Sequence, residues 1–150
     1  FEPDPGSISC FKRTFAEELQ DGKVVLVEAA AWESPGILQF EVHDLWSAAS
    51  NVSKEGTLEV KAVTIDSEVA NLGLASVDFI KMDIEGAERH ALRGALQTLQ
   101  EFGPKMTISI YHREDDPEVI PEIVLGAQPA YRMVSSGGHW GGILYVSPPK

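Results

Sequence analysis

Val77–Ala95 reads VDFIKMDIEGAERHALRGA, and this stretch decides the fold class that the sequence predicts. It begins with an apolar run typical of a buried strand, passes the carboxylates Asp83 and Glu85, turns at Gly86 and continues with apolar residues at helical spacing. In an open α/β sheet, ligands bind where the carboxyl end of a strand meets the following helix. The stretch therefore predicts an α/β fold with Asp83 and Glu85 at its functional site.

The rest of the chain alternates between strand and helix patterns. Strands are expected at Lys23–Trp32, Ile37–Val42, Thr57–Ile65, Val77–Ile84, Lys105–Tyr111, Tyr131–Val134 and Ile143–Val146. Helices are expected from Asp4-Pro5 to Asp21-Gly22, after an N-cap at Asp66, over Gly86–Phe102 and from Asp116-Pro117 onward, and His43–Gly56 reads as a loop. The pattern predicts one α/β domain over residues 1–150, with a mostly parallel sheet around a central buried strand at Val77–Ile84 and an antiparallel C-terminal hairpin.

The composition excludes several classes of partner. The formal net charge is −11, and the 12 Lys and Arg residues form no dense cluster, so neither nucleic acid nor an anionic membrane surface is expected as a partner. No segment approaches the ~20 consecutive apolar residues of a membrane-spanning helix. The single cysteine, Cys10, excludes an internal disulfide and favours a reducing, cytoplasmic location.

Two explanations fit the carboxylates after the central strand. Asp83 and Glu85 are two residues apart, so on a strand their side chains share one face. A carboxylate at the end of an apolar strand is costly unless it is paired or faces a cleft, which favours a pair directed at a substrate or cofactor. In the structural alternative, Glu85 caps the helix and pairs with Arg89, while Asp83 pairs with Lys81.

Three further residues at strand ends could join this site. Glu2 precedes the first helix, where an acid could bind ribose hydroxyls, although a surface Glu before a turn fits equally well. Lys81 could hold a charged partner in the site or extend to the sheet edge. His112 follows the next strand, and it could be a general base, a substrate ligand, a metal ligand or a solvent-facing loop residue.

The remaining histidines carry weaker signals. His139 lies beside Trp140 between glycine pairs, which indicates either a flap that contacts substrate or a plain hairpin loop. His43 and His90 are interpreted as structural. No spacing of histidines and acids matches a zinc motif, so the sequence predicts no metal site.

The core Ile80–Glu88, with the sequence IKMDIEGAE, resembles the signature of FkbM-type methyltransferases. The likeness continues in order along the chain. Phe1-Glu2-Pro3 resembles the end of the family's second strand, Ala29-Ala30 with Gly36 its third strand and hairpin, Tyr111-His112 the end of its fifth strand, and Tyr131 the start of its sixth. The resemblance implies a Rossmann-like methyltransferase fold, S-adenosyl-L-methionine as the methyl donor, and a hydroxyl oxygen of a small molecule or glycan as the acceptor.

The resemblance also implies roles for individual residues. On the donor side, Glu2 would bind the ribose, and Glu28, Ala29 and Ala30 would flank the adenine. On the acceptor side, Asp83 would lie near both the sulfonium and the acceptor, Glu85 would orient substrate or anchor the helix, and His112 would face the acceptor pocket. Asp83, Glu85 and His112 are thus the catalytic candidates, and Lys81, His112 and His139 the candidate substrate contacts.

One part of the family pattern is absent from these 150 residues. The family's first strand and glycine-rich loop would precede Phe1, so the sheet is expected to be truncated at its N-terminus. Two strands would then keep unpaired edges in the middle of the sheet, which predicts a homo-oligomer formed through those edges. The chain is accordingly expected to be most of a methyltransferase, or alternatively a non-catalytic domain that acts in association or ligand binding.

Overall fold

The computed structural model describes residues 1–42, 50–137 and 142–148. The helices are α1 (Pro5–Thr14), α2 (Ala16–Gln20), α3 (Ile65–Asn71), α4 (Glu88–Arg93), α5 (Leu96–Phe102) and α6 (Asp116–Ala127). The strands are β1 (Ala30–Ala31), β2 (Gly36–Glu41), β3 (Asn51–Val52), β4 (Leu58–Val63), β5 (Phe79–Met82), β6 (Lys105–Ser109), β7 (Arg132–Ser136) and β8 (Ile143–Ser147). The predicted alternation of strands and helices is therefore confirmed in its main features.

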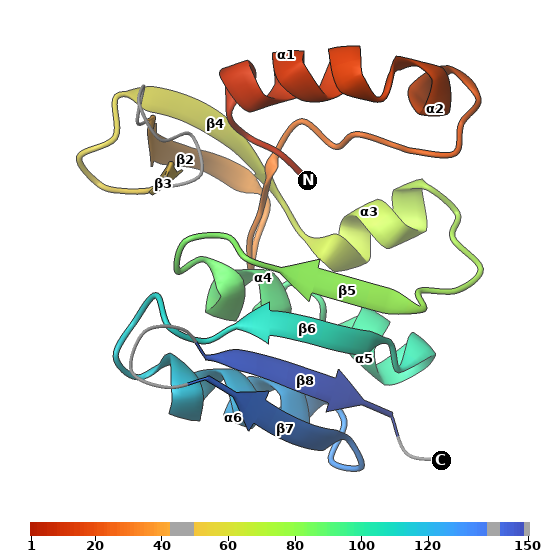
Figure 1. Cartoon of the computed structure of the whole chain (residues 1–150), viewed down its shortest axis with the longest axis vertical. Coiled ribbons are helices and arrows are strands. Elements are labelled where there is room, and N and C mark those ends of the chain that lie inside the picture. Colours follow the sequence, from red (N-terminus) through yellow and green to blue (C-terminus); the bar gives the residue numbers. More distant parts are fainter. Residues whose placement is uncertain (43–49, 138–141, 149–150) are drawn as a thin grey trace.

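The described strands form two mixed sheets rather than one mostly parallel sheet. Their orders are β1-β4-β2-β3 and β5-β6-β8-β7, and Figure 1 shows one sheet above the other. Only the β1–β4 and β5–β6 ladders are parallel, whereas the other described ladders are antiparallel. The prediction of a mostly parallel sheet was wrong, because β2 runs antiparallel to β3 and β4, and β8 runs antiparallel to β6 and β7. No described strand lies between β1 and β5, so the two parallel pairs stay in separate sheets. The predicted C-terminal hairpin is confirmed as β7–β8.

Two strand predictions failed for this same reason. Of the expected strand Lys23–Trp32, only Ala30–Ala31 is paired, and the N–H of Glu2 donates to the carbonyl of Val27 at 3.0 Å. β5 is an edge strand rather than the central buried strand, and its Phe79 is 55% exposed. An apolar run can occupy a strand, but its hydrogen bonds and its burial both depend on neighbouring strands.

The hydrophobic core lies between the second sheet and helices α4, α5 and α6, which cover one face of that sheet (Figure 1). Side chains alternate along each strand, so every second residue points at the helices. The fully buried members of this core include Leu92, Leu99, Met106, Ile108, Ile120 and Val124. The opposite face of the sheet exposes Phe79, Val134 and Tyr145. No helix in the described part of the chain has the length and apolar character needed to cross a membrane.

The helix boundaries follow local capping chemistry. α1 begins after Asp4, whose carboxylate accepts from the N–H of Ser7 at 2.7 Å, and Gly103 ends α5 in the left-handed conformation at φ 56°. Both ends were predicted. The single helix expected over Gly86–Phe102 is instead divided into α4 and α5 at Gly94-Ala95, and the first helix is interrupted at Phe15.

Asp66 has a different role from the predicted one. Thr64 is the N-cap of α3, because its hydroxyl oxygen accepts from the N–H of Ser67 at 3.0 Å. The Asp66 carboxylate instead accepts from the N–H groups of Gln97 and Thr98 at 3.0 and 2.8 Å, and from the Thr98 hydroxyl at 2.7 Å. It therefore satisfies the N-terminal donors of α5, a helix that begins 30 residues later in the chain.

Candidate active site

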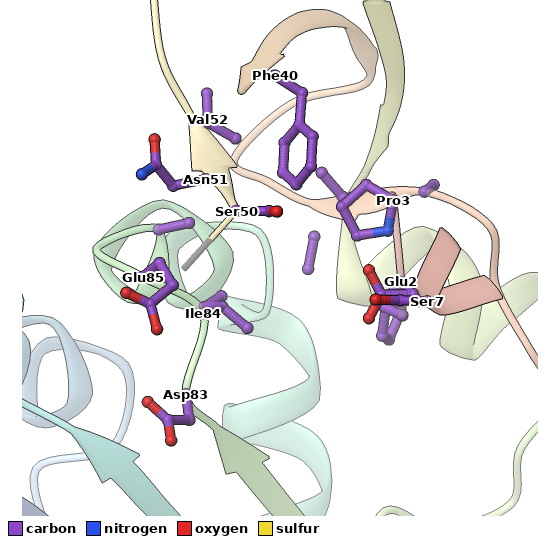
Figure 2. A pocket seen from close by; sticks show the side chains of 15 residues that line it. Glu2, Pro3, Ser7, Phe40, Ser50, Asn51, Val52, Asp83, Ile84 and Glu85 are labelled. Carbon is purple, nitrogen blue, oxygen red and sulfur yellow. The ribbon is translucent and has the colours of Figure 1, made fainter. Parts of the chain in front are cut away.

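A pocket of about 340 Å³ lies between the two sheets. Its walls come from the segment before α1, the chain leading through β1, the β2 and β3 strands, and the turn after β5. Figure 2 shows Glu2 and Ser7 on one side of this space and Asp83 and Glu85 on the other, with Phe40 and Val52 at one end. A cavity of this size is within the range of small-molecule sites, roughly 300–1,000 Å³.

Four of the five predicted cofactor residues line this pocket. Glu2, Ala29, Ala30 and Asp83 all contribute to its wall. The Glu2 carboxylate is half-buried and accepts from the N–H of Asp4 at 2.9 Å, which holds it at the entrance of α1. Ala29 and Ala30 are buried, and their small side chains leave open space beside the backbone. Glu28 does not line this pocket: its carboxylate pairs with Lys12 at 2.5 Å.

The turn after β5 presents Asp83 and Glu85 to the pocket. Glu85 has φ 55° and Gly86 has φ 89°, so two successive residues are in the left-handed region. For a residue with a side chain this conformation costs roughly 1–2 kcal/mol, which the surrounding structure must offset. The Glu88 carboxylate does so by accepting from the N–H of Ile84 at 2.7 Å. Strain of this kind is concentrated at functional turns.

Arg89 rules out part of the structural alternative for these carboxylates. Its guanidinium contacts Asp115 at 2.6 Å and Asp116 at 2.5 Å. It thereby connects α4 to the start of α6. The expected pair between Arg89 and Glu85 is not among the described ion pairs, and Glu85 remains a pocket residue.

Asp83 is held by several groups at the pocket wall. The Tyr111 hydroxyl donates to its Oδ1 at 3.2 Å, and Lys81 Nζ lies 3.6 Å from its Oδ2. Partial burial alone would raise the pKa of Asp83, but hydrogen bonds from Ser109 and Tyr111 and the charge of Lys81 lower the pKa below its ordinary value. Asp83 is therefore a carboxylate at neutral pH. Asp83 thus pairs with Lys81 and also lines the pocket, so its position agrees with both explanations considered for it from the sequence.

The His112 side chain is largely buried beside Asp83, so it is not a solvent-facing loop residue. Its side chain is 9% exposed, and its Nε2 lies 3.6 Å from both Asp83 Oδ1 and Glu85 Oε2. Its Nδ1 lies 3.0 Å from Oε1 of Glu88, a residue with no exposed surface. His112 does not itself line the pocket. It lies beside Asp83, which does line the pocket.

Sequence reasoning missed Glu88 as part of this site. The signal was present, because Glu88 is the first residue of α4 and follows Asp83 by five positions across a glycine turn. Its carboxylate therefore turns back toward the strand end. Of the other histidines, His90 stacks on Trp32 with ring centroids 3.9 Å apart and contacts Glu33 at 3.1 Å, in keeping with a structural role. His43 and His139 lie outside the described residues.

Comparison with known proteins identifies the family. The Methyltransferase FkbM domain profile matches residues 1–133. The chain belongs to the FkbM methyltransferase family. The FkbM pattern in the IKMDIEGAE segment is thereby confirmed, and that segment forms β5, the strained turn and the start of α4 in this domain.

Two relatives of this FkbM domain are informative. Hexuronic acid methyltransferase AglP of Haloferax volcanii is 25% identical over 129 residues, which are 85% of this chain and 52% of that protein. The crystal structure of Methyltransferase FkbM from Methylobacillus flagellatus KT has a TM-score of 0.73 and 23% identity, and the match covers 97% of this chain and 35% of that one. The fold of the described domain is thus an FkbM methyltransferase fold. The chain spans about half the length of the curated relative and about a third of the solved one.

Proposed function

We propose that this FkbM domain takes part in S-adenosyl-L-methionine-dependent methyl transfer to a hydroxyl oxygen of a small molecule or glycan. The observation that supports the proposal most is that Glu2, from the segment before α1, and Asp83, from the turn after β5, line one pocket. The name of the relative from Haloferax volcanii, a hexuronic acid methyltransferase, supports a sugar-containing acceptor. A cytoplasmic location belongs to the same proposal, and the single cysteine Cys10 is a free thiol, as a reducing compartment would keep it.

The pocket residues fit the adenosine part of the donor. Glu2 offers a half-buried carboxylate that can accept from ribose hydroxyls, the interaction that acids provide at this position in dinucleotide-type folds. Ala29 and Ala30 leave room for a flat ring, and the buried Phe40 provides an apolar wall. When bound, S-adenosyl-L-methionine would supply a methyl group on a positively charged sulfur, and the part of the protein is positioning and electrostatics.

Asp83 is the residue that we assign to the acceptor. Its carboxylate can accept a hydrogen bond from the acceptor hydroxyl and so orient the attacking oxygen, while Tyr111 and Lys81 restrict its own movement. Alignment of two reactants is worth several kcal/mol of barrier in general, roughly 7–11 at the upper end. Glu85 lines the same wall, and its negative charge favours a cationic donor in the pocket. His112 positions Asp83 from behind.

The donor assignment can be tested with the chain itself. We expect adenosine and S-adenosyl-L-methionine to bind the same pocket, because Glu2, Ala29 and Ala30 are proposed to contact the adenosine part that both ligands share. Glu2→Gln should weaken both ligands by roughly fivefold or more, since a hydrogen bond to a charged acceptor is about twice as strong as one to a neutral acceptor. Ligand-observed NMR with increasing adenosine measures this loss. Glu28→Gln is the matched control, because Glu28 pairs with Lys12 outside the pocket.

Two results would contradict this assignment. One is equal weakening by Glu2→Gln and Glu28→Gln, and the other is no competition between adenosine and S-adenosyl-L-methionine. The acceptor is tested separately, with an isotopically labelled methyl donor and a panel of hydroxylated sugars and small molecules incubated with the natural full-length polypeptide. Label recovered as a methyl ether would support the hydroxyl acceptor, whereas label recovered as a methyl ester would exclude it.

A second candidate function is association, and the edge position of β5 favours it. Among the described strands β5 pairs only with β6, so its other edge has free backbone groups beside the exposed Phe79. We propose that two copies of the chain pair through this edge. Sedimentation should then show a concentration-dependent dimer that Phe79→Lys weakens. Ile37→Lys, at another exposed apolar position on β2, should leave the dimer unchanged. A monomer at every concentration would refute the pairing.

A further inference from the structure

A cluster of three side chains at the pocket wall contains polar atoms that have no hydrogen-bond partner: it joins the exposed Asp83 to the buried Glu88 and the largely buried His112. It consists of Asp83, from the end of β5, Glu88, the first residue of α4, and His112, from the segment after β6. Glu88 has no exposed surface, and the His112 side chain is 9% exposed. The three side chains come from different elements and meet at one point below the pocket wall.

Unpaired polar atoms are concentrated at this cluster. In the described part of the chain, four buried side-chain atoms have no hydrogen-bond partner: Asp4 Oδ2, Glu88 Oε2 and both ring nitrogens of His112. His112 Nδ1 lies 3.0 Å from Glu88 Oε1, but the two groups are not oriented as donor and acceptor of a hydrogen bond. Each unsatisfied buried group costs about 1–3 kcal/mol. The two ring nitrogens of His112 point in different directions, so the unpaired atoms favour a bound ion that contacts one ring nitrogen together with Glu88.

The charge around this point favours a cation. The carboxylates of Asp83 and Glu85 lie 3.6 Å from His112 Nε2, and Glu88 adds a third carboxylate on the Nδ1 side. Lys81 contacts this cluster from outside, because its Nζ is 3.6 Å from Oδ2 of Asp83 and its side chain is 64% exposed. Asp83 Oδ1 accepts one hydrogen bond, from Tyr111, and retains a second lone pair, while Glu88 Oε2 has no hydrogen-bond partner.

The distances fit a metal ion. One ligand atom from each of Asp83, Glu88 and His112 lies within 4.8 Å of the other two. Two ligands on opposite sides of a divalent ion are about 4.4 Å apart, twice a bond of about 2.2 Å, so movements of a few tenths of an ångström complete the site. Two carboxylate oxygens and an imidazole nitrogen suit a first-row divalent ion such as Mn²⁺ or Zn²⁺ better than Mg²⁺ or Ca²⁺, which prefer oxygen alone.

We propose that Asp83, Glu88 and His112 bind a divalent transition-metal ion such as Mn²⁺. Three protein ligands leave coordination positions open, as in catalytic metal sites. Because Asp83 also lines the donor pocket, the ion would hold this carboxylate in place at the pocket wall. That role rests on the proposed methyl transfer, whereas the binding of the ion does not.

Electron paramagnetic resonance of Mn²⁺ added to the chain tests the site without an assay of enzymatic activity. Free Mn²⁺ gives a strong signal that bound Mn²⁺ loses, and we expect one saturable site. His112→Gln and Asp83→Asn should each raise the dissociation constant at least about tenfold. Glu114→Gln is the control, because it removes an exposed carboxylate two residues from His112 and should leave affinity unchanged. This comparison is needed because a chain of net charge −11 also attracts Mn²⁺ without a site.

Localisation of the ion completes the test. Paramagnetic broadening of amide signals should be strongest at residues 83–88 and 112, and weaker at the acidic start of α6. Binding that Glu114→Gln weakens as much as His112→Gln, or no saturable binding in excess Mn²⁺, would overturn the proposal. A site that binds Mn²⁺ in a protein that transfers no methyl group would leave the metal proposal standing and refute the proposed function, and methyl transfer without Mn²⁺ binding would do the reverse.

Discussion

Replacement of Asp83 by Asn is expected to lower the rate of methyl transfer at least roughly a hundredfold, the usual effect of removing one well-placed polar group from an active site. Asn has nearly the same shape as Asp and can still accept from the Tyr111 hydroxyl, so the fold should be retained. It lacks the negative charge and the second carboxylate oxygen with which Asp83 faces the pocket and His112. The effect should therefore appear in kcat rather than in the amount of folded protein.

The measurement is methyl transfer at saturating donor and acceptor in the natural full-length polypeptide, together with thermal unfolding of each variant. Asp78→Asn is the matched control, because Asp78 is exposed just before β5 and lies outside the pocket. We expect that control to retain full activity. If Asp83→Asn keeps the wild-type kcat, or loses activity only in proportion to lost folded protein, Asp83 is a structural residue and the assignment of the acceptor side is wrong.

The second large effect is expected from Gly94→Ala, which should destabilise the protein by about 3 kcal/mol or more, at the upper end of the cost of overpacking. A Cβ on Gly94 would lie 2.0 Å from the carbonyl oxygen of Trp32 and 3.3 Å from the side chain of Thr64. The oxygen belongs to the backbone, so no change of rotamer can relieve the clash. Either α4 and α5 must move away from the first sheet or the chain must unfold.

The position of Gly94 explains why this clash matters to the site. It separates α4 from α5 in the helical layer of the second sheet, whereas Trp32 follows β1 and donates to Val63 of β4 at 2.8 Å. The Gly94 carbonyl in turn accepts from the N–H of Asp66 at 2.9 Å. The two sheets are thus joined at this close approach, and their separation sets the pocket between Glu2 and Asp83.

Urea unfolding monitored by circular dichroism measures the loss. Gly126→Ala is the control, because a Cβ there meets nothing within 4 Å and the residue lies inside α6. Alanine at an open helical position should be neutral or stabilise by up to about 1 kcal/mol. Equal midpoints for Gly94→Ala and the wild type would show that the two sheets can separate without cost, and the link between Gly94 and the pocket would have to be abandoned.

Much of the local structure and part of the site could be predicted from sequence. The N-cap at Asp4, the stop at Gly103 and the β7–β8 hairpin all depend on neighbouring residues, and all three were correct. Asp83 and Glu85 both line the pocket, because a glycine turn after an apolar strand directs its flanking side chains to the end of the sheet, and their roles stay predictions. Such features depend on interactions over a few residues, where sequence patterns carry the information.

Three other features depended on partners that are distant in sequence. Asp66 appeared suited to cap its own helix, but its carboxylate reaches α5 because the two helices pack side by side. Glu88 looked like an ordinary first-turn acid, and only its burial against His112 makes it part of the site. His112 could equally have faced solvent. In each case the partner is 24 or more residues away in the chain, beyond the reach of helical or strand periodicity.

By itself, the sequence determined the family, the order of helices and strands and the residues at the turn after β5, because these follow from local propensity, capping and a contiguous motif. The tertiary structure alone decided that the strands form two sheets, that β5 is an edge, and that Asp83, Glu88 and His112 converge. The physical reason is that a strand's burial and a buried polar group's partner are set by whatever segment packs beside them. The sequence pattern of a single strand or helix does not identify that neighbouring segment.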